Sequence, residues 1–142
     1  MIADLCDNND VVFLQETWLT PSEINLLDRV HNEFLAFSIS AVNDSELLVG
    51  RPFVGLSILW RKCIDSSCKV SRVNDSRILC FEIISQPANL RLINVYLPYY
   101  CPNNVEEYSL YIGKIASIIE GHETDQIMIL GDFSAGLPSV FL

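Results

Sequence analysis

Three apolar segments of the sequence each lead into a residue that could take part in catalysis. The run VVFLQ at 11–15 precedes Glu16, LRLINV at 90–95 precedes Tyr96, and IMIL at 127–130 leads through a glycine to Asp132. Sites of α/β proteins commonly form where strands end. If the first and last of these strands run roughly parallel, we expect Glu16 and Asp132 to share a site at one sheet edge.

Two carboxylates in one site provide hard oxygen ligands, which suit Mg²⁺ or Mn²⁺ with several water molecules left on the ion. Phosphate ester chemistry matches that environment, because such an ion neutralises phosphoryl oxygens, activates water or stabilises the leaving oxygen. The phenol of Tyr96 could hold a phosphate oxygen. The plainer alternative is that each carboxylate faces solvent without a function, which is the commoner fate of any single such residue.

The charge of the chain is uneven along its length. The net charge of −9 argues against broad electrostatic adhesion to nucleic acid. Residues 1–50 carry a balance of −8, residues 51–77 of +4 and residues 78–142 of −5. The basic stretch could face a phosphate backbone, with Arg51, Arg61 and Arg77 as candidate contacts. A solvated surface hairpin explains the same charges without a function.

Several classes of protein are disfavoured. The five cysteines form no CxxC pair and leave one over, and the two histidines lack zinc-site spacing, so we expect neither a disulfide framework nor zinc. No apolar run approaches the roughly 18 residues that cross a bilayer, and acids stand where a signal peptide would carry bases. We therefore expect no membrane partner and an intracellular protein, nuclear or cytoplasmic, that is not secreted.

Hydrophobic periodicity and capping signals predict the elements that must position these residues. Strands are predicted at 11–15, 34–40, 54–60, 77–84, 90–96 and 126–130, and the pair 77–84 and 90–96 should be antiparallel. Helices are predicted over 2–9, over 21–31 behind a capping box at Thr20–Glu23, and from 103 or 104 to about 120. The apolar face of the last helix would be Tyr108, Ile112, Ile115 and Ile119. This order indicates a single layered α/β domain.

Four segments resemble successive motifs of the DNase I-like endonuclease/exonuclease/phosphatase superfamily: QETWL at 15–19, GRPFVGLSILWR at 50–61, NVYLP at 94–98 and ILGDFSAG at 129–136. They are most similar to the endonuclease domain of LINE-type non-LTR retrotransposons. Each motif is weak alone, but the four occur in order over most of the chain. The resemblance implies a four-layer α/β/β/α sandwich, of which residues 1–142 would form one partial domain.

The resemblance also implies roles for individual residues. Glu16 falls on a magnesium ligand, Tyr96 on a tyrosine that positions phosphate, and Asp132 on the aspartate of the GDFN motif. Ser134 replaces the asparagine of that motif, and its single hydroxyl should stabilise the transition state less well. Tyr99 stands where nucleases that remove abasic sites often have asparagine, so the sequence leans away from that branch.

Two parts of the family pattern are missing. The first strand, with its metal-site asparagine, and the C-terminal aspartate and serine-aspartate-histidine motif have no counterpart here. We therefore expect a domain truncated at both ends that lacks the general base pair. Neither His31, at the end of a predicted surface helix, nor His122, roughly 16 Å from Asp132 along a strand, is assigned a catalytic role.

The main hypothesis from the sequence is a fragment of a Mg²⁺-dependent phosphodiesterase that hydrolyses DNA. One alternative is a catalytically inactive, transposon-derived remnant. Another is a phosphoinositide or sphingolipid phosphatase-like member of the same superfamily, because fold alone does not settle the substrate. The basic stretch 51–77 favours a nucleic-acid backbone over a lipid headgroup.

Overall fold

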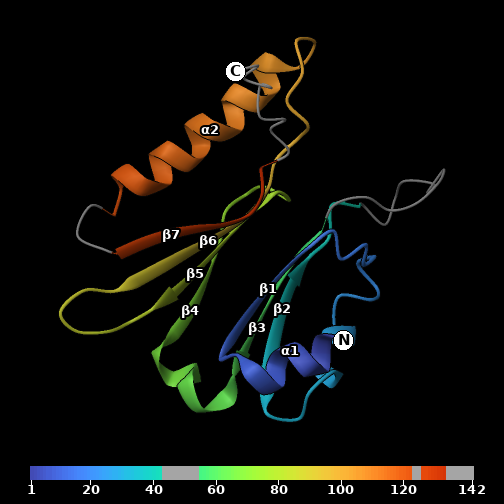
Figure 1. The fold of residues 1–142 in the computed structure, drawn as a ribbon, viewed down its shortest axis with the longest axis vertical. Helices are drawn as coiled ribbons and strands as arrows, with labels where there is room; N and C mark the ends of the chain where they lie inside the picture. The colour runs from blue at the N-terminus through green and yellow to red at the C-terminus, as the bar shows by residue number, and fades with distance from the viewer. Residues whose placement is uncertain (43–54, 123–125, 134–142) are drawn as a thin grey trace, which may run out of the picture.

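The computed structural model describes residues 1–42, 55–122 and 126–133, which form two packed β-sheets (Figure 1). One sheet has the order β1-β3-β2 and comprises β1 (Val11–Gln15), β2 (Phe34–Ile39) and β3 (Leu56–Arg61). The other has the order β4-β5-β6-β7 and comprises β4 (Cys68–Arg72), β5 (Ile78–Ile83), β6 (Leu90–Tyr96) and β7 (Gln126–Asp132). All neighbouring strands are antiparallel except β6 and β7, which are parallel.

Helices cover the outer faces of the two sheets, so the molecule has four layers (Figure 1). Helix α1 (Ile2–Asn8) packs on the three-stranded sheet through Cys6, and helix α2 (Val105–Glu120) packs on the four-stranded sheet through Ile115. The core between the sheets is formed by β3 and β5, with Ile58 and Phe81 fully buried. The expected partial α/β/β/α sandwich is confirmed.

The predicted strands all form, and the predicted antiparallel pair is β5 and β6. Strand β4 and the preceding 3-10 helix η2 (Lys62–Ser67) were not predicted. Strand β4 is the edge of its sheet, where only Cys68 and Val70 pack against the core and the other three residues of the strand are polar. Two apolar positions are too few to stand out as a strand in the sequence.

The helix predicted behind Thr20 was wrong. The segment forms turns followed by the short 3-10 helix η1 (Leu26–Arg29). Thr20 and Glu23 do interact, but the Thr20 hydroxyl and amide both donate to the Glu23 carboxylate, at 2.8 and 3.1 Å. The hydroxyl therefore does not cap a backbone N–H, and so short a helix has little stability of its own.

The apolar face of α2 also needs one correction. Tyr108, Ile115 and Ile119 contact the sheet as predicted, but Ile112 is exposed and Tyr111 and Ile118 take part instead. Within the described ranges, no helix has the length and apolar character required to cross a bilayer.

Candidate active site

Glu16 and Tyr96 meet where strands of the two different sheets end. Glu16 follows β1, Tyr96 closes β6, and the Tyr96 hydroxyl donates a hydrogen bond to Glu16 Oε1. A buried polar link joins the sheets just inside this point, because Gln15 Nε2 donates to Asn94 Oδ1 at 2.6 Å. Asn94 Nδ2 in turn donates to the carbonyl oxygens of Leu14 and Ser57, at 3.2 and 3.3 Å. These bonds fix the end of β1 against the end of β6.

The chain leaves β1 with an unusual backbone. Glu16 has φ +52° and Trp18 has φ +54°, a left-handed region that non-glycine residues rarely adopt. The Thr17 N–H donates to the Gly55 carbonyl oxygen at 3.2 Å, and a Cβ on Gly55 would lie only 2.7 Å from Thr17 Oγ1. Strain of this kind costs on the order of 1–3 kcal/mol and is concentrated at functional sites. The turn thus directs an exposed carboxylate toward Tyr96.

Asp132 reaches the same place through the parallel pairing of β6 and β7. Tyr96 and Asp132 are register partners, and the Leu97 N–H donates to the Asp132 carbonyl oxygen at 2.9 Å. The preceding Gly131 has φ +140°, and a Cβ there would lie 1.9 Å from the Val95 carbonyl oxygen. Only glycine allows the two strands to approach so closely just before Asp132.

The electrostatics of the site keep Tyr96 protonated. The hydrogen bond to Glu16, burial, and the negative charges of Glu16 and Asp132 raise the pKa of Tyr96 to about 12, with Arg77 acting in the opposite sense. At neutral pH the phenol is therefore a hydrogen-bond donor. Arg77 Nη1 donates to the Tyr96 carbonyl oxygen at 3.2 Å, and its guanidinium lies 5.5 Å from the centre of the Tyr96 ring.

The structure does not bring all the predicted site residues together. Arg61 lies at the opposite end of β3 from the Glu16 turn, where Nε donates to Asp10 at 2.9 Å and Nη1 to Glu33 at 3.2 Å. These two carboxylates neutralise its charge locally. Arg51 and Ser134 lie outside the described residues, so the proposed roles of all three arginines and of Ser134 stay predictions.

The two histidines have structural contacts away from the strand ends. The side chain of His31 was expected to be exposed, but it is only 15% exposed, packs edge-on against the Phe34 ring and lies 3.2 Å from Asp7 Oδ1. His122 Nδ1 lies 2.9 Å from the Arg91 guanidinium. Arg91 is near the start of β6 and Tyr96 at its end, so roughly 16 Å of strand separates them.

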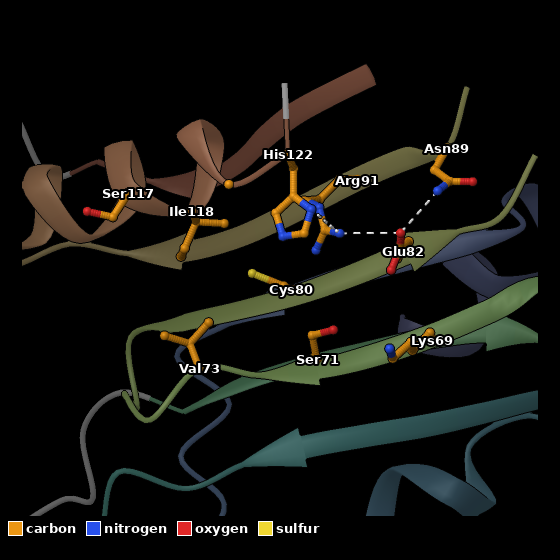
Figure 2. A pocket seen from close by; sticks show the side chains of 11 residues that line it. Lys69, Ser71, Val73, Cys80, Glu82, Asn89, Arg91, Ser117, Ile118 and His122 are labelled. Carbon is orange, nitrogen blue, oxygen red and sulfur yellow. Dashed lines mark hydrogen bonds and ion pairs between the residues drawn. The ribbon is translucent and has the colours of Figure 1, made fainter. Parts of the chain in front are cut away.

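A pocket of about 380 Å³ surrounds this Arg91 cluster on the outer face of the four-stranded sheet (Figure 2). Arg91 is buried and forms an ion pair of 3.3 Å with Glu82, whose carboxylate also accepts from Asn89. The pocket therefore surrounds an ion pair already neutralised within the sheet, far from Tyr96. A smaller cavity of about 230 Å³ borders Glu16 and Thr17, but its other walls, among them Ile2 and Leu27, lie on the helix α1 side of the three-stranded sheet and include neither Tyr96 nor Asp132.

The donor set at the strand ends fits a weakly held magnesium ion. Among the described residues, no group of three or more His, Cys, Asp and Glu side chains could enclose a metal. Mg²⁺ does not need such a cage, since one or two carboxylates, water and substrate phosphates usually hold it. Glu16 and Asp132 are both exposed beside Tyr96 and provide two carboxylates of this type.

Sequence reasoning missed Gln15 and Asn94, which position the site without forming its surface. The available signal was the lone asparagine inside the apolar run LRLINVY. A fully buried amide requires hydrogen-bond partners. Its partners lie about 80 residues away in the chain, so the sequence does not identify them.

Comparisons with known proteins agree with this fold. The Endonuclease/Exonuclease/phosphatase family matches residues 1–139, while no curated protein sequence matches significantly. TDP2 of D. rerio, solved with a single strand DNA product, is 22% identical, with a TM-score of 0.58 over 92% of this chain and 52% of that one. The AP endonuclease LMAP from Leishmania major is 13% identical, with a TM-score of 0.64 over 90% and 46%.

A mannosyl-6-phosphatase from Bacteroides thetaiotaomicron VPI-5482 is also similar, with 13% identity and a TM-score of 0.59 over 94% of this chain and 55% of that one. The chain spans about half the length of these solved structures. At such identities the likeness shows the fold, in which nucleases and phosphatases both occur. Because the family match covers nearly every residue, this chain belongs to the Endonuclease/Exonuclease/phosphatase family.

Proposed function

We propose that this chain is part of a Mg²⁺- or Mn²⁺-dependent phosphodiesterase domain that hydrolyses DNA phosphodiester bonds. The observation that carries the proposal is the hydrogen bond from Tyr96 to Glu16, made between two sheets and beside Asp132. The pairing places acidic oxygen ligands and a neutral hydrogen-bond donor at one point. A hydrolase that binds a phosphoryl group through a divalent ion can use carboxylates to hold the ion and a donor to contact a phosphate oxygen.

Each residue has a distinct part in the proposal. Glu16 would hold the metal, and the protonated phenol of Tyr96 would donate to a phosphate oxygen. Asp132, with Ser134 after it, would orient the phosphate. When bound, the ion supplies charge neutralisation at the phosphoryl oxygens and makes a water molecule more acidic. Arg77 is the cation best placed to attract a phosphate, and Arg51 and Arg61 remain candidates for more distant contacts.

The proposal also includes the origin of the chain, its substrate and the extent of its domain. The motif wording supports an origin in a LINE-type endonuclease, and DNA in the solved TDP2 complex supports nucleic acid as the substrate. Residues 1–142 would form one incomplete domain of an intracellular enzyme. The whole enzyme would then need the first strand and the C-terminal motif that the resemblance implies.

A plasmid-nicking assay tests this function. We expect nicking of supercoiled DNA with Mg²⁺ or Mn²⁺, and none with EDTA, from a protein that joins residues 1–142 to the first strand and the C-terminal motif of the family. Glu16→Gln and Asp132→Asn should each reduce the rate by about 100-fold or more, because each removes a charge that acts on the metal or phosphate. Ile84→Ala, at an exposed position at the other end of its sheet, is the matched control. Nicking that persists in EDTA or in Glu16→Gln would contradict the proposal.

The net charge of −9 favours a second candidate, a phosphatase that acts on a small soluble phosphate ester. Such a substrate needs no extended basic surface. Release of inorganic phosphate from inositol phosphates, without plasmid nicking, would establish this reading. A folded chain that is inactive in both assays would instead be the inactive remnant that the sequence leaves open.

A further inference from the structure

Exposed aromatic side chains gather around the candidate active site. Among the large hydrophobic residues of the described ranges that are exposed, the aromatic ones are Trp18, Tyr99, Tyr100 and Phe133. Trp18 lies two residues after Glu16, Phe133 directly follows Asp132, and the two tyrosines lie three and four residues after Tyr96. The other aromatic rings of the described ranges are at least partly buried. Each exposed aromatic ring of the described ranges therefore lies within four residues of Glu16, Tyr96 or Asp132 in the sequence.

The loop that carries the two tyrosines is held in place by its own hydrogen bonds. Asn104 Nδ2 donates to the Tyr99 carbonyl oxygen, and Asn104 Oδ1 accepts from the Cys101 N–H at 2.9 Å. The Tyr100 ring packs edge-on against Tyr108 of α2, with 5.1 Å between ring centres. The loop is therefore ordered before any ligand arrives, which lowers the entropy cost of binding.

Tyr108 also connects this loop to the end of β7. Its hydroxyl donates to the carbonyl oxygen of Phe133 at 3.3 Å. The aromatic residues after Tyr96 and the one after Asp132 are thus linked through the first turns of α2. Trp18 lies apart from this group, in the turn that follows Glu16 and a strand of the other sheet.

Charge limits what such a surface could bind. The chain carries 18 acidic and 9 basic residues, and ion pairs to carboxylates already occupy Arg61 and Arg91. Phosphate contacts alone would give little affinity for nucleic acid, because that affinity depends on lysine and arginine. Stacking of bases on aromatic rings adds roughly 1–3 kcal/mol per base and needs no positive charge. Paired bases within a duplex are already stacked on one another and do not expose their faces.

We propose that Tyr99 and Tyr100, with Phe133 and Trp18 at the border, form a stacking subsite for unpaired nucleobases next to the phosphate at Glu16, Tyr96 and Asp132. The subsite would select single-stranded or flipped-out nucleotides over regular duplex. This proposal takes nucleic acid as the substrate from the proposed function. The binding itself does not require catalysis.

The test is equilibrium binding of a single-stranded oligonucleotide that contains the fluorescent base 2-aminopurine, measured in EDTA so that neither metal binding nor cleavage contributes. We expect the fluorescence to be quenched on binding, because the base stacks on an aromatic ring. Tyr99→Ala should weaken binding about 5- to 150-fold, and Tyr99→Phe should stay within about twofold of the parent chain. Affinity should fall only weakly with salt, with a slope of about −1 in log–log form, as expected for one or two phosphate contacts.

Ile84→Ala is the control, because Ile84 is 56% exposed and Tyr99 is 66% exposed, and Ile84 lies at the far end of the same sheet. It should bind like the parent chain, and a thermal melt should show that both alanine variants are folded. Binding by Tyr99→Ala that equals the parent, or binding by Tyr99→Phe as weak as by Tyr99→Ala, would overturn the subsite. Displacement by mannose 6-phosphate but not by oligonucleotide would also overturn it, in favour of a sugar ring.

The two proposals fail in different ways. If the parent chain nicks plasmid but does not quench the oligonucleotide, the stacking subsite is wrong and the proposed phosphodiesterase stands. If quenching is present and is lost in Tyr99→Ala while no metal-dependent hydrolysis occurs, the subsite stands and the proposed activity is wrong.

Discussion

Glu16 combines a candidate catalytic carboxylate with an unfavourable backbone conformation. Its φ of +52° lies in the left-handed region, where a Cβ costs roughly 1–2 kcal/mol relative to glycine. Glu16→Gly and Glu16→Ala both remove the carboxylate and its bond to Tyr96, so they differ mainly in backbone strain. We expect Glu16→Gly to be more stable than Glu16→Ala by about 1 kcal/mol in urea unfolding, although neither variant should nick DNA.

An alanine variant as stable as the glycine variant would show that Glu16 is not strained in solution. Lys62→Gly and Lys62→Ala provide the control pair at an exposed residue that has no positive φ. There the glycine variant should be no more stable than the alanine variant, since glycine loses more backbone entropy on folding.

The pKa of Tyr96 gives a second prediction at this scale. Its rise from 10 to about 12, caused first by the hydrogen bond to Glu16, means that folding favours the protonated phenol. The resulting stabilisation is fully present below pH 10 and is lost as pH rises from 10 toward 12. In absorbance titrations at 295 nm, the parent chain should contain a tyrosine component that ionises well above pH 10, and Tyr96→Phe should lack this component.

Glu16→Gln sharpens the test, because it replaces the carboxylate whose hydrogen bond, and to a smaller extent whose charge, raises the pKa of Tyr96. The late-ionising component should shift toward the usual tyrosine range in this variant. Tyr111→Phe, which removes a ring of α2 close to Arg77, should leave that component unchanged. A late component that is unaffected by both Tyr96→Phe and Glu16→Gln would assign it to another residue.

At the scale of elements, Gly131 decides how β7 approaches β6. A Cβ at this position would overlap the Val95 carbonyl oxygen, and its φ of +140° is strained for any other residue. We expect Gly131→Ala to lower the free energy of unfolding by about 3 kcal/mol and to displace Asp132 from Tyr96. Chemical denaturation measures the first effect, and the loss of nicking with a retained fold measures the second.

The matched control is Gly113→Ala in α2, where an added Cβ meets nothing within 4 Å. Glycine inside a helix is less favourable than alanine by roughly 0.5–1 kcal/mol, so this variant should be stabilised. A Gly131→Ala variant as stable as the parent chain would show that the close approach of β6 and β7 does not hold in solution.

The same elements show what the sequence can and cannot predict. Buried strands such as β3 and β6 are mostly apolar and were predicted, whereas the edge strand β4 has too few apolar residues to be found. The chemistry-bearing ends at Glu16, Tyr96 and Asp132 were predicted because each follows such a run. Glu16 and Asp132 were expected to share a site at one sheet edge, but they end strands of two different sheets, so their relative position depends on how the sheets stack.

Arg61 shows that a residue in a recognisable motif can still lie far from the site. It lies in a segment that resembles a family motif, yet antiparallel pairing places it beside the start of β1, at the far end from Glu16. Position in the sequence fixes neither the direction of a strand nor its partner. Arg77 comes to Tyr96 because β5 starts where β6 ends, which again follows from pairing.

In the molecule as a whole, strands β1 and β7 both have a free edge on the same side of the sandwich. Strand β1 contacts both β6 and β7 across the sandwich, so β1 and β7 border the same side of it. Among the described residues, β1 pairs only with β3 and β7 only with β6. Edges of this kind can pair with a further strand, whether it comes from the same polypeptide or from another molecule.

Met128 makes the edge at β7 apolar as well as unpaired. It lies two residues before Leu130, hence on the same face of β7, toward the core between the sheets, but it is 51% exposed. We expect the purified chain to associate as its concentration rises through the micromolar range, and Met128→Lys to reduce that association, because charge on an edge strand opposes pairing. Light scattering coupled to gel filtration measures the mass of both proteins.

Leu110→Lys places the same charge on a residue of α2 that is 59% exposed and should leave association unchanged. If Leu110→Lys dissociated the chain as well as Met128→Lys does, general charge repulsion rather than the β7 edge would explain the effect.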